Sequence, residues 1–183
     1  MKYNFIDLFS GAGGLSYGFE KAGLNCLAGV DSYKQAIETF KKNHNKAIAF
    51  SEDIRKISIN EFKKKIKNKK IQIICGGPPC QGFSTIGPGN AKDSRNHLFL
   101  QFVRFVKDLK PEIIVLENVT GLLAKKNINT VKSIFNCFES LGYNLNAKVL
   151  ASHHYGVPQI RRRVILIGNR LSIENIYPKK IFN

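Results

Sequence analysis

The chain has 183 residues, of which 43% are hydrophobic, so it can bury one sizeable core and a single domain is expected. The net charge of +16 and the pI near 9.8 indicate a polyanionic partner, with nucleic acid favoured over an anionic membrane surface. The four cysteines show no CxxC pair and no Cys/His ligand spacing, so neither a zinc site nor a disulfide scaffold is indicated, and no apolar run approaches the length of a membrane span.

Short apolar runs alternate with amphipathic stretches along the whole chain. The runs predict strands at residues 3–8, 26–30, 47–50, 71–75, 113–119, 144–151 and 164–168. The amphipathic stretches predict helices at residues 15–22, 34–44, 59–66, 98–107 and 130–141, with a loop over residues 81–96. This alternation is typical of an α/β domain with a mostly parallel sheet, in which right-handed crossovers bring the strand-to-helix loops to one edge.

A glycine-rich turn follows the first predicted strand and opens the first predicted helix. It runs from Asp7 to Leu15 (DLFSGAGGL). Its glycines permit a tight turn and the close approach of a ligand, and the helix N-terminus offers free N–H groups. The spacing departs from G-x-G-x-x-G, which argues against a nicotinamide cofactor, and the lack of G-x-x-x-x-G-K-[ST] argues against a nucleoside triphosphatase.

Carboxylates follow the second and third predicted strands. Asp31 ends the second strand about twenty residues after the glycine turn, where a carboxylate can accept from both hydroxyls of a ribose. Asp53, followed by Ile54, comes after the third strand and suits an adenine amino group. Together with the turn, these residues indicate an adenosine-containing cofactor.

The stretch Gly76 to Ser84 (GGPPCQGFS) presents Cys80 beyond the end of the fourth predicted strand. The two prolines stiffen the turn, because each fixes its own φ and keeps the residue before it out of the helical region. An isolated cysteine is most often a small buried hydrophobe, but this one stands at the strand edge where ligands bind in open parallel sheets. We therefore expect Cys80 to carry chemistry, and the following glycine-containing segment, Gln81 to Asn96, to close over the ligand.

Glu117 stands near the end of the fifth predicted strand. Taken alone, such a carboxylate is as readily a structural acceptor as a functional acid. It lies, however, on the edge that is expected to carry Cys80. A partly desolvated glutamate there can hold a proton near neutral pH and form a hydrogen bond with a ring nitrogen.

Three consecutive arginines lead into the last predicted strand. Alternation along a strand directs Arg161 and Arg163 to one side and Arg162 to the other. Two guanidinium groups on one side can anchor a carbonyl oxygen, a carboxylate or a phosphate.

These motifs, FSGAGG, GGPPCQGFS, ENV and QIRRR, occur in the order found in one family. Together they resemble the catalytic domain of the DNA (cytosine-5) methyltransferases, which use S-adenosylmethionine. The resemblance runs from Phe5 to about Gly168. It implies a Rossmann-like methyltransferase fold, α/β, with a mostly parallel sheet and one antiparallel strand, and a catalytic domain over residues 1–168.

The resemblance also implies roles for individual residues. By motif position, Cys80 is the nucleophile, and Glu117, Arg161 and Arg163 complete the catalytic group. No metal ion is expected. The residues implied to bind S-adenosylmethionine are Phe9, Ser10, Gly11, Gly13, Gly14, Leu15, Asp31, Asp53, Ile54, Pro79 and Leu98.

The chemistry of cytosine agrees with these roles. Carbon 5 is a poor nucleophile, and attack of the Cys80 thiolate on carbon 6 converts the ring into an enamine-like species that can take a methyl group. Glu117 is expected to bind N3 and the exocyclic amine, Arg163 the O2 carbonyl, and Arg161 to support Glu117 or the loop. The target base must also leave the duplex, because its reacting atoms are stacked inside.

The chain departs from the family after the arginine-containing strand. Members of this family continue into a target-recognition region and two further motifs, whereas residues 169–183 form only a tail. We therefore expect a split or truncated methyltransferase half that needs a second polypeptide with the target-recognition region. Duplex DNA is the expected substrate, no membrane partner is expected, and the bacterial cytoplasm or nucleoid is the expected location.

Two other functions compete with DNA methylation. One branch of the family acts on transfer RNA, although Gly82-Phe83-Ser84 after the PPCQ sequence resembles the DNA-acting majority. A non-catalytic module that binds DNA or a partner is the second, but it would need none of Cys80, Glu117 and Arg163. A cysteine hydrolase has no support, because no histidine stands in a recognisable pairing motif.

Overall fold

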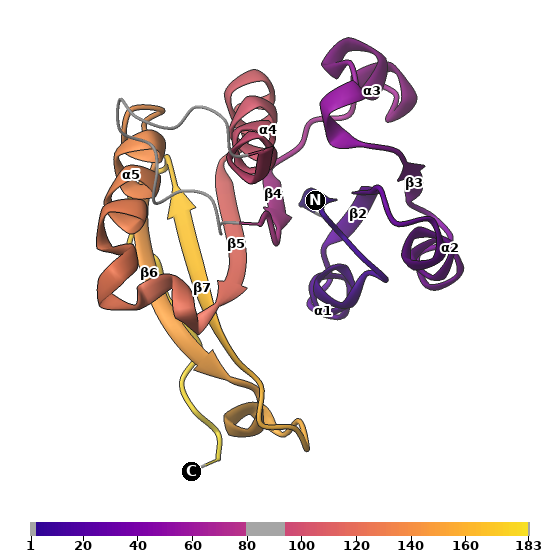
Figure 1. Cartoon of the computed structure of the whole chain (residues 1–183). Coiled ribbons are helices and arrows are strands. Elements are labelled where there is room, and N and C mark those ends of the chain that lie inside the picture. The colour runs from indigo at the N-terminus through magenta and orange to yellow at the C-terminus, as the bar shows by residue number, and fades with distance from the viewer. Residues whose placement is uncertain (1–2, 80–93, 183) are drawn as a thin grey trace.

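The computed structural model describes residues 3–79 and 94–182. Within these residues a seven-stranded sheet has the order β3-β2-β1-β4-β5-β7-β6 (Figure 1). Its strands are β1 (Asn4–Leu8), β2 (Asn25–Asp31), β3 (Ile48–Ser51), β4 (Ile73–Gly76), β5 (Ile113–Val119), β6 (Asn144–Ala151) and β7 (Arg162–Asn169). Only β7 runs against its neighbours, because it pairs antiparallel with both β5 and β6.

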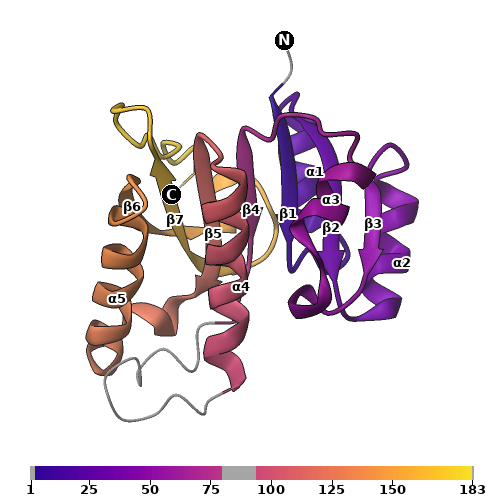
Figure 2. The ribbon, with the colours of Figure 1, turned by 90° about the horizontal axis from the view of Figure 1, so that it is seen from above.

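Helices cover both faces of the sheet. In Figure 1, α1 (Gly14–Lys21) and α2 (Lys34–Asn43) lie below the strands β1 to β3, and α3 (Ile59–Lys65) and α4 (Ser94–Leu109) lie above the sheet. Figure 2 shows α4 crossing in front of β4 and β5, with α5 (Ile128–Glu139) beside it. The sequence prediction of an α/β fold with a mostly parallel sheet and one antiparallel strand is therefore confirmed.

Side-chain alternation along β1 separates the two hydrophobic layers. Ile6 and Leu8 face the larger layer, together with the phenylalanines of α4 and Phe138 of α5. Phe5 faces the smaller layer with Phe40 of α2. Asp7 points to this second side as well, which places a carboxyl group under α1.

The four parallel crossovers bring the strand ends to a common edge. Strands β1 to β5 all run parallel to one another, so the turns that follow β1, β2, β4 and β5 leave the sheet on one side. Strand β7 begins at this edge with Arg162, because it runs in the opposite direction. Within the described residues, the glycine-rich turn, Asp31, Glu117 and the arginines therefore lie at this edge of the sheet.

Most element boundaries lie within about two residues of the expectations, and two kinds of difference are larger. Helix α4 begins at Ser94, not at Leu98, so the end of the expected loop 81–96 is helical. The first turn of this helix is polar, and the apolar periodicity on which the prediction rested begins only at Leu98. Short 3₁₀ helices at Ile54–Lys56, Thr120–Leu123, Lys125–Asn127 and Ser152–Tyr155 were also not predicted, since such turns carry no apolar repeat.

The residues after β7 pack back onto the β6–β7 hairpin. Asn175 is buried and donates to the Asn144 carbonyl and to Asn146 Oδ1, at 2.9 and 2.8 Å. The Tyr177 hydroxyl donates to the carbonyl oxygens of Asn146 and Ile165. The tail thus belongs to the packed structure up to residue 182, although the expectation that it leads to a target-recognition region stays a prediction.

Candidate active site at the carboxyl edge of the sheet

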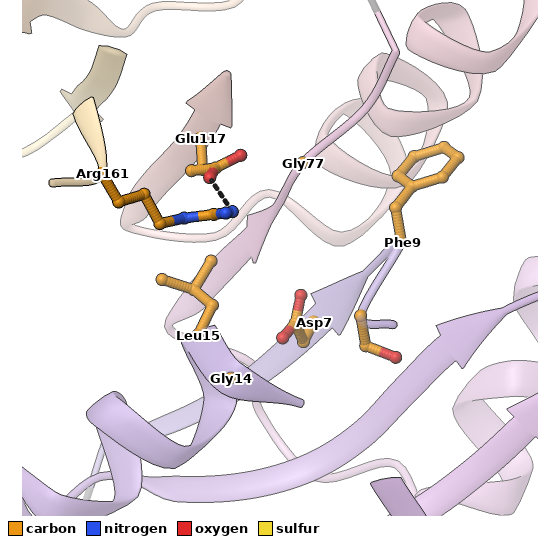
Figure 3. Close-up of a pocket in the computed structure, with 8 residues that line it drawn as sticks. Asp7, Phe9, Gly14, Leu15, Gly77, Glu117 and Arg161 are labelled. Carbon is orange, nitrogen blue, oxygen red and sulfur yellow. Dashed lines mark hydrogen bonds and ion pairs between the residues drawn. The ribbon is translucent and has the colours of Figure 1, made fainter. Parts of the chain in front are cut away.

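An open cavity of about 480 Å³ lies at the carboxyl edge of β1, β4 and β5 (Figure 3). In this view Glu117 and Arg161 lie on one side of the cavity and Phe9 on the other, with Asp7 between them. The cavity therefore joins the glycine-rich turn to the predicted catalytic carboxylate. Its lining residues are Asp7, Phe9, Ser10, Gly14, Leu15, Gly77, Glu117 and Arg161.

The turn between β1 and α1 has a strained backbone. Phe9 has a φ of +63°, in the left-handed region that residues with a side chain rarely adopt. Gly13 has a φ of +89° and caps the N-terminus of α1, and its amide donates to the Ser10 carbonyl at 2.9 Å. Such strained positions cluster at ligand-binding sites, where the surrounding structure holds them.

Asp31 fixes this turn to the end of β2. Its Oδ2 accepts from the Gly11 amide and its Oδ1 from the Tyr33 amide, each at 2.8 Å. The Ser10 amide adds a bond to the Val30 carbonyl at 3.0 Å. The structure thus brings Asp31 together with the glycine turn, and the remaining lone pairs of its carboxylate are available for ribose hydroxyls.

Asp7 is a site residue that the sequence prediction missed. Its side chain lines the cavity and is buried, with Ser16 Oγ donating to Oδ2 at 2.6 Å. Burial raises the pKa of Asp7 to about 6, against the opposing effect of the Ser16 hydrogen bond. The sequence did contain a sign of this residue, because Asp7 is an acidic residue inside the otherwise apolar strand from Phe5 to Leu8. A buried charge there costs free energy, so its presence indicates a function.

Ser10 carries an unsatisfied hydroxyl in the same cavity. The residue is 9% exposed, and Oγ has no hydrogen-bond partner among the residues that the structure describes. A buried hydroxyl without a partner costs free energy. A polar ligand group in the cavity would remove that cost.

Glu117 pairs with both arginines that the sequence placed on one side of the strand entry. Its Oε1 lies 2.8 Å from Arg163 Nε and 3.4 Å from Arg161 Nη2. The predicted common side of Arg161 and Arg163 is thus confirmed. Arg161 contacts Glu117 as expected, whereas Arg163 lies closer to the carboxylate, and its Nη1 also donates to the Arg162 carbonyl.

The turn that leads to Cys80 is held against the end of β5. Asn118 Nδ2 donates to the Pro78 carbonyl at 3.0 Å. A Cβ added to Gly77 would lie 3.4 Å from Glu117 Oε2, so the chain passes close to the carboxylate. Cys80 itself, and most of the segment expected to close over the ligand, lie outside the described residues. Asn118, whose role the sequence did not reveal, thus positions the chain two residues before Cys80.

Asp53 is engaged with a neighbouring arginine in this structure. Both carboxylate oxygens accept from Arg55, and Oδ1 also accepts from its amide. The Arg55 side-chain hydrogen bond lowers the pKa of Asp53 to about 2. Ile54 is buried in the core, and Arg104 of α4 donates to its carbonyl at 2.8 Å.

The predicted site residues therefore fall into two groups. The first group lines the cavity itself and comprises Phe9, Ser10, Gly14, Leu15, Glu117 and Arg161. The second group lies outside the cavity lining within the described part of the chain and comprises Gly11, Gly13, Asp31, Asp53, Ile54, Pro79, Leu98 and Arg163. Of this second group, Gly11, Gly13, Asp31 and Arg163 contact residues of the first group or of its turn, whereas Leu98 packs against the core.

The three cysteines that the structure describes do not suit nucleophilic chemistry. Burial raises the pKa of Cys75 well above its ordinary value and that of Cys26 to about 12. Burial raises the pKa of the Cys137 thiol as well. Thiols that resist ionisation are weak nucleophiles, so none of the three competes with the prediction for Cys80.

Across residues 3–79 and 94–182, no group of three or more His, Cys, Asp or Glu side chains is arranged to hold a metal ion. None of the helices in these ranges has the length and apolar character needed to cross a bilayer.

Comparison with known proteins identifies the family and several relatives. The sequence profile of the family described as C-5 cytosine-specific DNA methylase matches residues 3–183. The Type II methyltransferase M1.HphI of Haemophilus parahaemolyticus is 40% identical over 182 residues, covering 98% of this chain and 49% of its own length. M.FnuDI of Fusobacterium nucleatum is 42% identical over 173 residues, covering 93% and 48%.

Solved structures show the same fold. A crystal structure described as a DNA modification methyltransferase encoded within a prophage (E. coli) superposes with a TM-score of 0.83 at 34% identity, over 100% of this chain and 52% of that one. The Dnmt2 methyltransferase of S. pombe, at 23% identity and a TM-score of 0.73, shows the fold alone. The chain spans about half the length of the relatives it matches. With a matching profile over nearly all of its residues and its motifs gathered at one edge of the sheet, the chain belongs to the C-5 cytosine-specific DNA methylase family.

Proposed function

We propose that this chain is the catalytic half of a DNA (cytosine-5) methyltransferase. It would transfer a methyl group from S-adenosylmethionine to carbon 5 of cytosine in duplex DNA. The observation that carries this proposal is the single cavity lined by both the glycine-rich turn and the Glu117–Arg161 pair. A methyl donor on the turn and a base held by Glu117 would then share one space.

S-adenosylmethionine is the methyl donor that membership of this family implies, and the residues present fit it. When bound, it supplies an electrophilic methyl group on a sulfonium. Asp31, which holds the glycine-rich turn, would accept from the ribose hydroxyls, and Phe9 presents an aromatic ring at the cavity. The unsatisfied Ser10 hydroxyl and the Asp7 carboxyl line the cavity and would bind polar groups of the amino-acid part.

Cys80 is the proposed nucleophile. Its thiolate would add to carbon 6 of cytosine, and the electron density gained at carbon 5 would take the methyl group. Loss of the carbon 5 proton to a base and elimination of the Cys80 thiolate would then release 5-methylcytosine. The family motif GGPPCQGFS and the anchoring of Pro78 by Asn118 support this role.

Glu117 is proposed to bind the N3 edge of the cytosine. Arg161 and Arg163 flank its carboxylate, and the side chain of Glu117 is 28% exposed. The two guanidiniums hold the carboxyl group in place, so that it would accept from the exocyclic amine and, when protonated, donate to N3. Arg163 would also be near enough to the bound base to stabilise charge on the O2 carbonyl.

Recognition of DNA is proposed to need a further region. The relatives are about twice as long as the chain, and we propose that a second polypeptide carries the complementary target-recognition region. The substrate would place the protein with the DNA, in the bacterial cytoplasm or nucleoid. Flipping of the target base out of the duplex is part of this proposal, because its reacting atoms are otherwise stacked.

Labelled methyl transfer tests the proposed function. The chain is incubated with labelled S-adenosylmethionine and unmethylated duplex DNA, alone and with the complementary half of a close relative. We expect transfer to carbon 5 of cytosine in the mixture and its loss in Cys80→Ser. Glu117→Gln should lower the rate by about 10²–10⁴-fold, the range for a catalytic proton-transfer group.

Three other results would change the assignment. Rates of roughly 10 per second with the chain alone, the median across enzymes, would refute the need for a second polypeptide. Preferential labelling of transfer RNA over DNA in a parallel reaction would favour RNA methylation. If the protein binds DNA without transferring a methyl group, and Cys80→Ser leaves that binding unchanged, the chain is a non-catalytic binding module.

A further inference from the structure

A buried histidine lies beneath the glycine-rich turn and has no part in the proposed chemistry. His44 follows the last residue of α2, and its side chain is fully buried. Its ring packs on Phe40 with the ring centroids 4.4 Å apart. Its Nδ1 lies 2.6 Å from Glu20 Oε2, and its Nε2 lies 3.1 Å from the Gly13 carbonyl oxygen.

Both partners of this ring are oxygen acceptors. A carbonyl oxygen can only accept, so Nε2 must carry the proton in the contact with Gly13. The contact between Nδ1 and the Glu20 carboxylate needs a second proton, either on the ring or shared with the carboxylate. Glu20 therefore fixes the orientation of the imidazole, with Nε2–H directed at the turn.

The Gly13 carbonyl is a junction between the turn and helix α1. It also accepts the amide of Tyr17 at 2.8 Å, the first backbone bond of the helix. A Cβ added to Gly13 would lie 2.3 Å from His44 Nε2 and 2.8 Å from Phe40 Cδ2. The end of α2 and the turn are thus in direct contact, and the adjoining Gly14 lines the cavity.

We propose that His44, oriented by Glu20, is a positioning residue for the cofactor. By holding the Gly13 carbonyl it keeps the backbone between Ser10 and Gly14 in the conformation that meets the ligand. The inference rests on the proposed function, because it takes the bound ligand to be S-adenosylmethionine. It adds a function for a buried histidine and its partly exposed carboxylate partner, 24 residues apart in the sequence, that the reaction does not use.

Two substitutions separate positioning from simple packing. The side-chain amide of His44→Gln can place an N–H near the position of Nε2, and that of His44→Asn can place one only near Nδ1. Both remove the ring from Phe40 and leave a comparable space. A difference between them therefore reports the hydrogen bond to Gly13 and not the loss of packing.

The experiment compares both variants with the unchanged protein in two measurements. Amide hydrogen exchange of Gly11 and Gly13 reports the order of the turn without ligand, and titration with S-adenosylmethionine reports its affinity, each with the complementary half present. We expect His44→Asn to exchange faster at both amides and to bind the cofactor about five- to tenfold more weakly, as for the loss of one hydrogen bond. His44→Gln should stay within about twofold of the unchanged protein.

Glu20→Ala tests the same proposal without a change in the core. Loss of the orienting carboxylate should weaken cofactor binding in the same direction as His44→Asn. Glu38→Ala removes an exposed carboxylate from α2 and should have no effect. If His44→Asn and His44→Gln bind S-adenosylmethionine equally well, or if Glu20→Ala binds it as the unchanged protein does, the inference is overturned and the proposed function is not affected. Failure of the unchanged protein to bind S-adenosylmethionine would overturn the proposed function and this inference with it.

Discussion

At the scale of single residues, Asp7 carries the most costly charge of the site. Its carboxyl group is buried between β1 and α1, and its pKa is raised from an ordinary value of 3.8 to about 6. The folded protein therefore holds this proton more tightly than the unfolded chain does. The linkage between protonation and folding then makes stability fall as the pH rises through this range.

Asp7→Asn should remove this pH dependence. Relative to the variant, the unchanged protein should lose up to about 3 kcal/mol of its free energy of unfolding as the pH rises from 4 to 6. Above pH 6 the difference between the two proteins should stay constant. Urea unfolding of both proteins over this pH range measures it. A constant difference across the range would show that Asp7 titrates as an exposed carboxyl group does.

Gly13 is the residue at which backbone conformation and close packing coincide. Its φ of +89° disfavours a side chain, and a Cβ would overlap His44 and Phe40. Gly13→Ala should lower the free energy of unfolding by about 2–4 kcal/mol, from the strained φ and the overpacking together.

Gly18→Ala is the matched control for Gly13→Ala. Gly18 lies inside α1, and a Cβ there would meet open space. Alanine should stabilise the helix by about 0.5–1 kcal/mol, because it costs less conformational entropy than glycine. Thermal unfolding of both variants distinguishes them. Equal effects at the two positions would contradict the close contact between the turn and α2.

The sequence revealed some of the site residues and concealed others. The glycine turn, Glu117 and the arginine pair follow from local signals, since strand ends, glycine spacing and alternation are properties of neighbouring residues. Asp7, Asn118 and His44 act through contacts with distant segments, at separations of 9, 40 and 31 residues. No local pattern encodes such contacts, although an acidic residue within an apolar strand was a detectable sign.

At the scale of elements, Arg104 connects helix α4 to the turn after β3. Its guanidinium donates to the carbonyls of Ile54 and Ile57, at 2.8 and 3.0 Å, and to Gln101 Oε1 at 2.7 Å. These bonds hold the 3₁₀ turn next to Asp53, which is expected to meet the adenine. Helix α4 thereby holds this turn from the face of the sheet opposite to α1.

Arg104→Ala should destabilise the protein and weaken cofactor binding. The loss of bonds to two buried carbonyl groups should cost about 1–3 kcal/mol of stability. Lys107→Ala, at an exposed position on the same helix, should cost little. Urea unfolding gives the stability and titration with S-adenosylmethionine gives the affinity. Equal behaviour of the two variants would mean that the turn after β3 holds its conformation without α4.

The elements were predicted well where an apolar repeat marks them. Strand β5 and strand β6 have the predicted bounds, and α1, α2 and α3 lie within one or two residues of them. The start of α4 was wrong because its first turn is polar, and the 3₁₀ helices were missed because a single turn gives no period. Boundaries therefore failed where the chain turns without burying a stripe of apolar side chains.

At the scale of the whole molecule, the order of the strands could not be read from local patterns. Alternating strands and helices predicted a mostly parallel sheet, but the antiparallel strand came from the family resemblance. The structure identifies that strand as β7, which pairs with both β5 and β6. This reversal is what carries Arg161 and Arg163 to the edge where β5 presents Glu117.

The central claim is that this fold brings Cys80 to a cytosine for covalent attack. Duplex DNA of mixed sequence that contains 5-fluorocytosine tests it most directly, because fluorine at carbon 5 cannot leave as a proton does and the adduct persists. The DNA, S-adenosylmethionine, the chain and the complementary half are incubated together. Peptide mass spectrometry then locates the attached base.

The expected result is an adduct on Cys80 that requires S-adenosylmethionine for its stability and is absent in Cys80→Ser. Cys26, Cys75 and Cys137 serve as internal controls, because burial raises the pKa of each thiol. Methyl transfer to ordinary cytosine without any adduct on the fluorinated base, or an adduct on one of these three thiols, would contradict the claim.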